Sequence, residues 1–448
     1  MPRADTPVTP DAQARADTST LIDSRKSHAI PALEIAGFDF LLNRINRRSS
    51  DDYNVTMSSI KRNLRGGWVV DNDPYKVNQL GHPYQGSMYH GFARSAGLSY
   101  WESAGYTFAG SLAWEIAGEK TPPSKNDQIN SGIGGSFLGE ALYRMSNLVL
   151  EQGRLPRFWG ELAAAVISPS TGFNRMAFGD RFTPVFASRD PAHYSRLQIG
   201  FAGTAQTRAG TSTTKLKRDE ALADFSMEYG LPGKRDYSYT RPFDYFAFQA
   251  TATTANGFEN LTTRGLLIGR EYEAGPHYRG VFGLYGSYDY FAPQLFRVSS
   301  TALSAGTTGQ AWLSKSIALQ GTALAGVGYT AVGTTKSVPG VRDYNYGTSP
   351  QALLALRLIF GSTAAIDLTA RDYFVPKSAD QRGRANVARL EAAVTWRVRD
   401  RHGVTIRYLG TRRDASFPDL GDVTQVRGTI GIFYTLLGQD RFGAVDWR

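Results

Sequence analysis

Cysteine is absent from the 448 residues, so the chain has neither a disulfide nor a thiolate that could bind metal or act as a nucleophile. A cysteine-free chain is compatible with an oxidising compartment but does not prove one. The sequence also lacks an apolar run of about 18 residues, which argues against a membrane-spanning helix. No apolar secretory segment follows Met1, so we expect that an exported form has lost its signal sequence.

Motifs for metal, phosphate or covalent chemistry are missing as well. The chain has 6 histidines, but no HExxH pair, no tight acidic loop, no GxSxG turn and no phosphate-binding P-loop. We therefore expect no metal and no cofactor.

The net charge of +10 is scattered along the chain, and we find no motif for nucleic-acid binding. The densest basic cluster permits two interpretations, a solvated face or a contact with anionic lipid headgroups. Its residues are Arg44, Arg47, Arg48, Lys61, Arg62 and Arg65.

Glycine and aromatic residues are abundant, with Gly 47, Tyr 23 and Phe 24. After about residue 193, apolar residues recur at every second position, which is the period of a strand. In the segment 390–399, Leu390, Trp396 and Val398 belong to an apolar face, while Glu391 and Arg397 belong to a charged one. A soluble sandwich and a membrane barrel both produce this alternation, so the connections must decide between them.

The connections differ on the two sides of the predicted sheet. Tight turns are expected at 399–403, 361–362 and 314–316, and long loops at 331–349, 375–385 and 412–422. A long segment at 230–241 is the exception on the short side. Short turns on one rim and long loops on the other are typical of outer-membrane barrels. We predict a membrane all-β barrel of about 12 antiparallel strands over residues 195–437, followed by a C-terminal tail at 438–448.

The last predicted strand has a second feature of such barrels. Thr429, Gly431, Tyr434 and Leu436 resemble the terminal signal that the bacterial barrel-assembly machinery reads, although the chain-terminal aromatic residue is absent. We therefore expect insertion by this machinery and a location in the bacterial outer membrane.

Residues before the barrel have a different pattern. Residues 1–30 are polar and aperiodic, as in a disordered tail, and residues 31–190 are mainly helical. Helices are predicted at Leu98–Ala117, Asp127–Leu150 and Arg157–Ile167, with Ser124 as the N-cap of the second.

We expect this helical block to act as a plug. Inward charges of the barrel need polar partners, and Gly135 and Gly139 form a GxxxG step that permits close helix packing. Glu140 and Arg144 are four residues apart and can pair with each other. Our prediction is that the hairpin Leu98–Leu150 lies within or against the lumen, with its charged side chains paired to the barrel wall.

The same block resembles a bacterial family known as domain of unknown function 3943. The resemblance rests on "NQLGHPYQGSMYHGFARSAGLSYWES", "YTFAGSLAWEIAGE", "PPSKNDQINSGIGGSFLGEALYR" and "GFNR", within residues 32–175. It implies an envelope location and a helical module joined to a barrel, and it implies no activity.

Candidate site residues converge on this block. His82 is a candidate general acid or base, oriented by Glu102 or Asp127, with the hydroxyl of Ser103 or Tyr84 nearby. The competing interpretation is that these groups only hydrogen-bond the loop "NQLGHPYQG" to the helices. This loop would then be a rigid segment ahead of a helix, with Pro83 in the first helical turn. The candidate binding residues are Tyr84, Gln85, Arg94, Glu115, Asn126, Glu140, Arg144, Asn174 and Arg175.

Two functions follow from this pattern. The favoured one is a plugged outer-membrane barrel for transport or envelope organisation. The alternative is a barrel-borne enzyme that acts on lipid or lipopolysaccharide through the polar site around His82. In both cases the expected partners are outer-membrane lipids or lipopolysaccharide.

Overall fold

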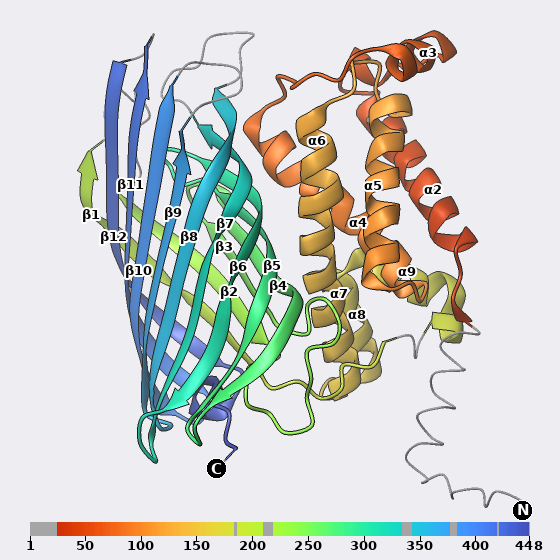
Figure 1. Cartoon of the computed structure of the whole chain (residues 1–448). Helices are drawn as coiled ribbons and strands as arrows, with labels where there is room; N and C mark the ends of the chain where they lie inside the picture. Colours follow the sequence, from red (N-terminus) through yellow and green to blue (C-terminus); the bar gives the residue numbers. More distant parts are fainter. Residues whose placement is uncertain are drawn as a thin grey trace, which may run out of the picture. The chain divides into compact units, whose positions relative to one another are not determined.

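The computed structural model describes residues 25–182, 186–208, 218–333, 343–376, 383–418 and 421–447. The chain forms two compact units (Figure 1). The helical unit comprises Met1–Val69 and Tyr84–Ser188, and the barrel unit comprises Val70–Pro83 and Arg189–Arg448. The short segment Val70–Pro83 thus belongs to the barrel although it lies within the helical part of the sequence.

The strands close into one antiparallel barrel, in which each strand pairs with the next and β1 pairs with β12. They are β1 (His193–Arg208), β2 (Asp219–Tyr229), β3 (Phe246–Thr253), β4 (Gly257–Ala274), β5 (Tyr278–Phe291), β6 (Val298–Trp312), β7 (Ile317–Gly333), β8 (Tyr344–Phe360), β9 (Ala364–Val375), β10 (Arg384–Arg399), β11 (His402–Phe417) and β12 (Gly421–Leu437). The predicted barrel of twelve strands is confirmed.

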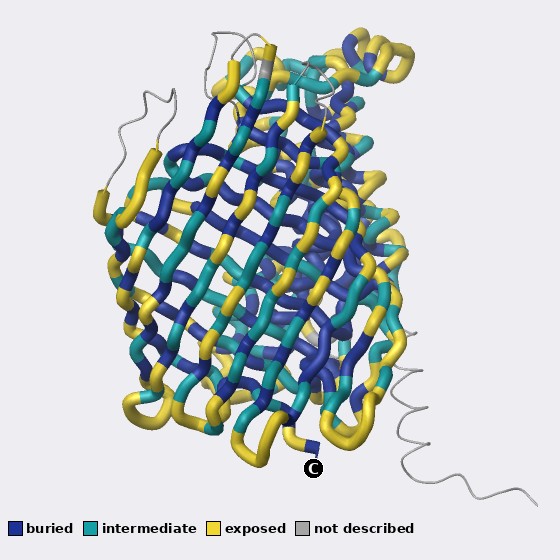
Figure 2. Tube along the Cα trace, turned by 60° about the vertical axis from the view of Figure 1, so that its left-hand side comes forward, coloured by how far each residue is buried: buried dark blue, intermediate teal, exposed yellow. Residues whose placement is uncertain are grey.

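Side chains alternate between the two faces of the barrel wall, as the burial pattern in Figure 2 shows. Leu390, Trp396 and Val398 are exposed on the outer face, whereas Arg389 and Thr395 of the same strand are buried. Closure pairs the backbone polar groups between strands, which is what allows a sheet to stand in hydrocarbon. With an apolar outer face, this is an outer-membrane barrel.

The tight turns lie at the predicted places. β10 and β11 are joined by Asp400 and Arg401, and β8 and β9 by 361–363. The predicted extents of the long loops 331–349 and 412–422 were wrong. Both connections are shorter, because strands continue into them. β8 already begins at Tyr344, and β11 runs to Phe417, where its inward Arg413 donates to Gln425 of β12 at 2.9 Å.

The segment Val70–Pro83 lies on the outer face of the barrel wall. Tyr288 and Tyr290 point outward, because Asp289 between them binds Arg371 inside the lumen. The Tyr288 hydroxyl donates to the carbonyl of Gln79, which belongs to the π-helical turn Val77–Gly81. The Asn78 amide donates to the Tyr344 hydroxyl at 2.7 Å. Buried tyrosines therefore hold this segment to the wall where an ordinary barrel meets lipid.

The helical unit confirms the predicted helices and adds others. Its helices are α2 (Ala29–Asn46), α3 (Met57–Arg65), α4 (His82–Ser95), α5 (Tyr100–Ala117), α6 (Lys125–Ile129), α7 (Gly135–Gln152), α8 (Arg157–Ile167) and α9 (Pro169–Phe178). α4 begins at the histidine–proline step, as predicted, but the loop expected in "NQLGHPYQG" was wrong, because Val77–Gly81 forms a π-helical turn that continues into α4. The Ser124 N-cap of α6 is confirmed. Within the described residues, no helix combines the length and the apolar content needed to cross a membrane.

A π-helical turn, Asn130–Gly134, separates α6 from α7 and was not predicted. The small residues around it permit the close packing that the GxxxG step indicated. A Cβ on Gly86 would lie 2.0 Å from the Ser131 carbonyl oxygen, and one on Gly139 would lie 2.7 Å from the Cβ of His90. α4 and the π–α7 segment thus pack backbone against backbone.

Candidate functional site

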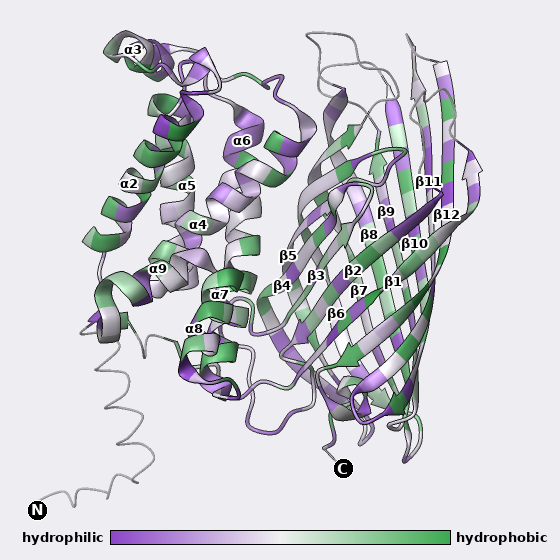
Figure 3. Ribbon diagram, turned by 180° about the vertical axis from the view of Figure 1, so that it is seen from behind, coloured by the Kyte–Doolittle hydropathy of each residue, from purple (hydrophilic) through white to green (hydrophobic). Residues whose placement is uncertain are grey.

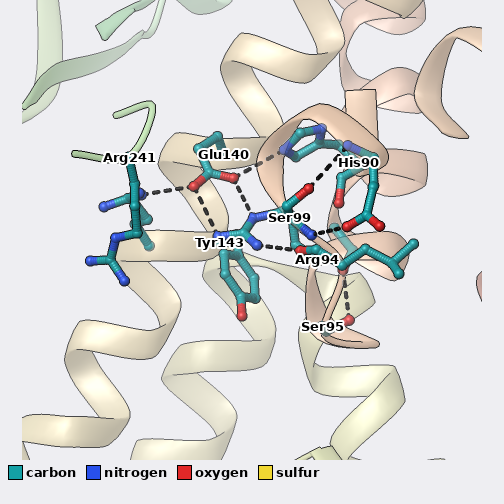
Figure 4. A network of polar contacts seen from close by, with 12 residues as sticks. His90, Arg94, Ser95, Ser99, Glu140, Tyr143 and Arg241 are labelled. Carbon is teal, nitrogen blue, oxygen red and sulfur yellow. Dashed lines mark hydrogen bonds and ion pairs between the residues drawn. The ribbon is translucent and has the colours of Figure 1, made fainter. Parts of the chain in front are cut away.

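A buried charged centre forms where α4 packs against α7 (Figure 4). Glu140 accepts from Nε of Arg144 at 2.8 Å and from Nε of Arg94 at 2.7 Å. Arg94 adds a second bond through Nη2 at 3.2 Å, and His90 Nε2 lies 3.0 Å from the same carboxylate. The side chains of Glu140 and His90 have no exposed surface. One carboxylate is therefore held by two guanidinium groups and an imidazole.

The protonation of this centre follows from its geometry. Burial raises the pKa of Glu140, but the charges of Arg94 and Arg144 outweigh it and bring the pKa well below its ordinary value. Burial lowers the pKa of His90, so the imidazole is neutral. Because a carboxylate only accepts, His90 donates through Nε2, and its Nδ1 faces the hydroxyl of Thr107 at 3.4 Å. The centre carries one net positive charge.

Aromatic rings surround the charges. The guanidinium of Arg94 lies 4.7 Å from the centroid of Tyr143, and that of Arg144 lies 4.9 Å from the centroid of Phe186. Tyr100 packs edge-on against His90 at 5.4 Å. Enclosed in this way, the carboxylate has neither the protonation state of a general acid nor an open approach for a substrate. The centre stabilises the packing of α4 on α7.

The predicted pairing of these charges with the barrel wall stays a prediction. Glu140 pairs with Arg144 and with Arg94, which both belong to the helical unit. The barrel charges likewise pair among themselves, since Asp367 binds Arg196 and Arg357. Both units thus contain ion pairs of their own, because a charge removed from water needs a partner at hydrogen-bond distance.

Glu102 of the proposed catalytic grouping has contacts of its own at the start of α5. Its carboxylate accepts from Lys26 at 2.6 Å and from the backbone of Ser99, where it completes the capping box of α5. The Ser103 hydroxyl is buried and has no hydrogen-bond partner among the described residues. His82 is buried and belongs to the barrel unit. Glu102 therefore acts as a helix cap, and its role in orienting His82 stays a prediction.

Three other predicted residues serve the helical framework. The Glu115 carboxylate accepts from the backbone of Ser124 at 2.7 Å, ahead of α6. Asn126 donates to the carboxylate of Asp127 at 2.9 Å. These buried contacts close the connection between α5 and α6.

The remaining predicted residues lie on α4 and α9. Asn174 donates to the hydroxyl of Ser95 at 2.8 Å, and Arg175 forms a two-pronged ion pair with Glu161 of α8. Gln85 donates to the Tyr89 hydroxyl, whereas the Tyr84 side chain is half exposed.

The lumen of the barrel holds a second set of charges, which sequence reasoning found only in part. Arg357 of β8 reaches Glu228 of β2 at 2.9 Å, across the barrel, and also reaches Asp367 of β9 at 2.7 Å. Arg196 of β1 binds the other oxygen of Asp367 at 2.6 Å. Arg196, Glu228 and Arg357 were not predicted, although each is an inward position of its strand.

Further ion pairs cross the lumen at other levels. Arg427 pairs with Glu220, and Arg371 with Asp289 at 2.7 Å. Between the pairs remain three cavities of about 80, 30 and 20 Å³. The first has room for only a few water molecules and is lined by Arg196, Glu228, Arg264, Arg357, Asp367 and Glu391, among others.

Apolar clusters close both ends of the described lumen. At the end with the tight turns, Phe442, Val445 and Trp447 of the tail fold inward, and Gln310 donates to the Val445 carbonyl at 2.7 Å. At the other end, Leu295 and Phe296 of the β5–β6 connection pack among inward residues of the wall. The barrel unit therefore fills its own lumen, a role that we had predicted for the helical hairpin.

No group of three or more His, Asp or Glu residues that could hold a metal ion occurs in the part of the chain that the structure describes.

Comparison with known proteins supports the predicted resemblance. Residues 67–170 match the family described as "Domain of unknown function (DUF3943)". The match includes the buried charged centre and Val70–Pro83, the segment on the barrel wall. The comparison with curated proteins returned no match.

Solved structures with a similar barrel include outer-membrane proteins. KdgM porin has 6% identity and a TM-score of 0.23 over 54% of this chain and 98% of its own. An outer membrane channel from Pseudomonas putida F1 has 8% identity and a TM-score of 0.28 over 55% of this chain and 96% of its own. OmpT of Vibrio cholerae has 9% identity and a TM-score of 0.21 over 55% and 96%. Likeness at this level carries no argument about solutes.

Proposed function

We propose that the protein organises the outer membrane as an anchor: a closed, non-conducting barrel that holds the helical unit in the envelope. The observation that carries the proposal is the set of ion pairs that cross the lumen, above all Arg357 between Glu228 and Asp367. A hydrated solute would have to separate these charges in a space of low dielectric constant. It would also have to displace the apolar clusters at both ends.

The attachment of Val70–Pro83 to the outer wall of the barrel supports the same function. The buried tyrosines of β5 and β8 bind Val70–Pro83 through side-chain and backbone groups. A simple pore does not need such contacts. They fix the segment that precedes α4 to the barrel wall. An anchor needs this attachment to be rigid, and the π-helical turn contributes the carbonyl of Gln79 to it.

Gated transport is the second candidate, and the polar cavities in the lumen favour it. A channel would need the three cavities to join, which requires the ion pairs around Asp367 to open. Conductance separates the two functions, because a gated channel opens at least transiently under voltage.

The test is single-channel recording of the full chain in a planar lipid bilayer. We expect no conductance steps from the wild-type protein. As the positive control, a variant without residues 438–448 and with Arg196, Arg357 and Asp367 all changed to alanine should conduct once its folding is verified by gel migration. Stable or voltage-gated steps from the wild-type protein would refute the anchor and favour transport.

A further inference from the structure

Helix α2 exposes apolar residues and turns its acidic residues inward. From Ala29 to Leu41 of α2, every exposed residue is alanine, glycine, leucine or phenylalanine. The acidic residues Glu34 and Asp39 face inward, where the Tyr89 hydroxyl donates to Asp39. A helix at a water surface buries its apolar stripe and exposes its charges, which is the opposite arrangement.

Two more helices repeat this inversion. On α5 the exposed residues are Trp101, Gly105, Phe108, Ala109, Ala113 and Ala117. The buried face of the same helix carries Ser103, Thr107, Ser111 and Glu115. On α9, Phe173 and Met176 are exposed whereas Asn174 is buried.

Helix α8 adds a continuous apolar stripe. Phe158, Trp159, Leu162 and Val166 are all exposed and fall on one face, at positions i, i+1, i+4 and i+8. Figure 3 shows apolar residues along α2 and α8. Exposed apolar surface of this extent marks a contact with something other than water.

The packing inside the unit is that of helices in lipid. Small residues lie at the closest approaches, since a Cβ on Gly110 would be 2.9 Å from Ile35 and one on Gly172 would be 2.4 Å from Ala165. Membrane helices associate through such residues, and they turn their polar and charged groups towards one another. The buried centre around Glu140 fits this rule.

We propose that the helical unit is immersed in the membrane, with the apolar faces of α2, α5, α8 and α9 against lipid acyl chains. Two observations identify lipid as the occupant. The chain enters α4 from Val70–Pro83, which already lies on the membrane-facing wall of the barrel. At its C-terminal end α2 carries Arg44 beside the exposed Ile45. The Arg44 guanidinium stacks 4.9 Å from the centroid of Phe40, and Arg47 and Arg48 follow. Anionic headgroups bind such a basic border.

The absence of native cysteine allows a clean test on the full chain. Leu33→Cys, Phe108→Cys and Val166→Cys would each carry one nitroxide label in vesicles of phosphatidylethanolamine and phosphatidylglycerol. Collision with dissolved oxygen, which concentrates in hydrocarbon, is compared with collision with a water-soluble nickel chelate. Ile268→Cys on the barrel wall is the lipid control, and Lys315→Cys in the β6–β7 turn is the water control.

We expect the oxygen-to-nickel ratio at the three helical positions to match that of Ile268→Cys and to exceed that of Lys315→Cys at least tenfold. A ratio like that of the turn would overturn the proposal, because the helices would then face water. Low collision with both reagents would overturn it too, since the faces would then be covered by protein, such as a second copy. The collision ratios do not depend on conductance, so failure of this proposal can be distinguished from failure of the anchor function.

Discussion

At the scale of single residues, several buried charges lie beside an opposite charge in the same unit. Glu140 is the clearest case, with two arginines and a histidine around a carboxylate that water does not reach. The i,i+4 spacing to Arg144 was sufficient to predict one of these contacts. Arg94 and His90 come from another helix, and no local spacing relates them to Glu140.

Glu140→Ala should lower the free energy of unfolding of the helical unit by about 3–5 kcal/mol, because it leaves two arginines buried without their carboxylate. Hydrogen exchange of α4 and α7 peptides in the reconstituted protein measures this loss. Lys26→Ala is the control, since its ion pair with Glu102 is partly exposed and should change stability by less than about 1 kcal/mol. Equal effects of the two substitutions would contradict the buried centre.

At the scale of elements, the positions of the helices depend on glycines at their contacts as well as on the larger side chains. α4 crosses the π-helical turn at Gly86, where the Ser131 carbonyl occupies the place of a Cβ. α2 also contains a glycine, Gly37, but nothing lies within 4 Å of its absent Cβ. The two glycines look alike in the sequence and differ only in what faces them.

Gly86→Ala and Gly37→Ala should accordingly have opposite effects. At Gly86 the new methyl group collides with backbone, which cannot move aside, so we expect a loss above about 3 kcal/mol and fast exchange in α7. At Gly37 alanine only restricts the unfolded chain and favours the helix, a gain of up to about 1 kcal/mol. A tolerated alanine at Gly86 would show that α4 and α7 are not in backbone contact.

At the scale of the whole molecule, the barrel is held from inside as well as through its strand ladders. Arg357 joins β8 to β2 on the far side of the barrel and to β9 beside it. The tail after β12 adds a further bond across the lumen, from Gln310 to Val445. Such cross-links couple strands that are far apart in the sheet, so the barrel should unfold as one unit.

Arg357→Ala removes this link and leaves the partly buried Glu228 and Asp367 in the lumen without the Arg357 guanidinium. We expect the urea midpoint of the refolded barrel to fall, by the equivalent of about 3–5 kcal/mol. Arg399→Ala is the matched control, because its side chain is 86% exposed in the β10–β11 turn. Gel migration of heated and unheated samples across the urea series gives both midpoints. If the midpoints coincide, the lumen pairs do not stabilise the barrel.

The strand part of the fold could be read from the sequence because its cause is local. Alternation puts Leu390 and Trp396 on one face and Arg389 and Glu391 on the other whatever the rest of the chain does. The same holds for helix starts such as Ser124, whose side chain caps the turn that follows it. Loop lengths were less predictable, since polar residues such as Arg413 continue a strand as readily as they form a loop.

Sequence alone thus determined the barrel, its strand number, the presence of a helical unit and the pair Glu140–Arg144, because each depends on residues a few positions apart. Tertiary structure decided which charges meet across the lumen and that Val70–Pro83 belongs to the barrel wall. It also decided that the tail and the β5–β6 connection close the lumen, and that α2 turns Glu34 inward and its leucines outward. These outcomes depend on partners tens to hundreds of residues away, and an amphipathic pattern does not state which of its faces is buried.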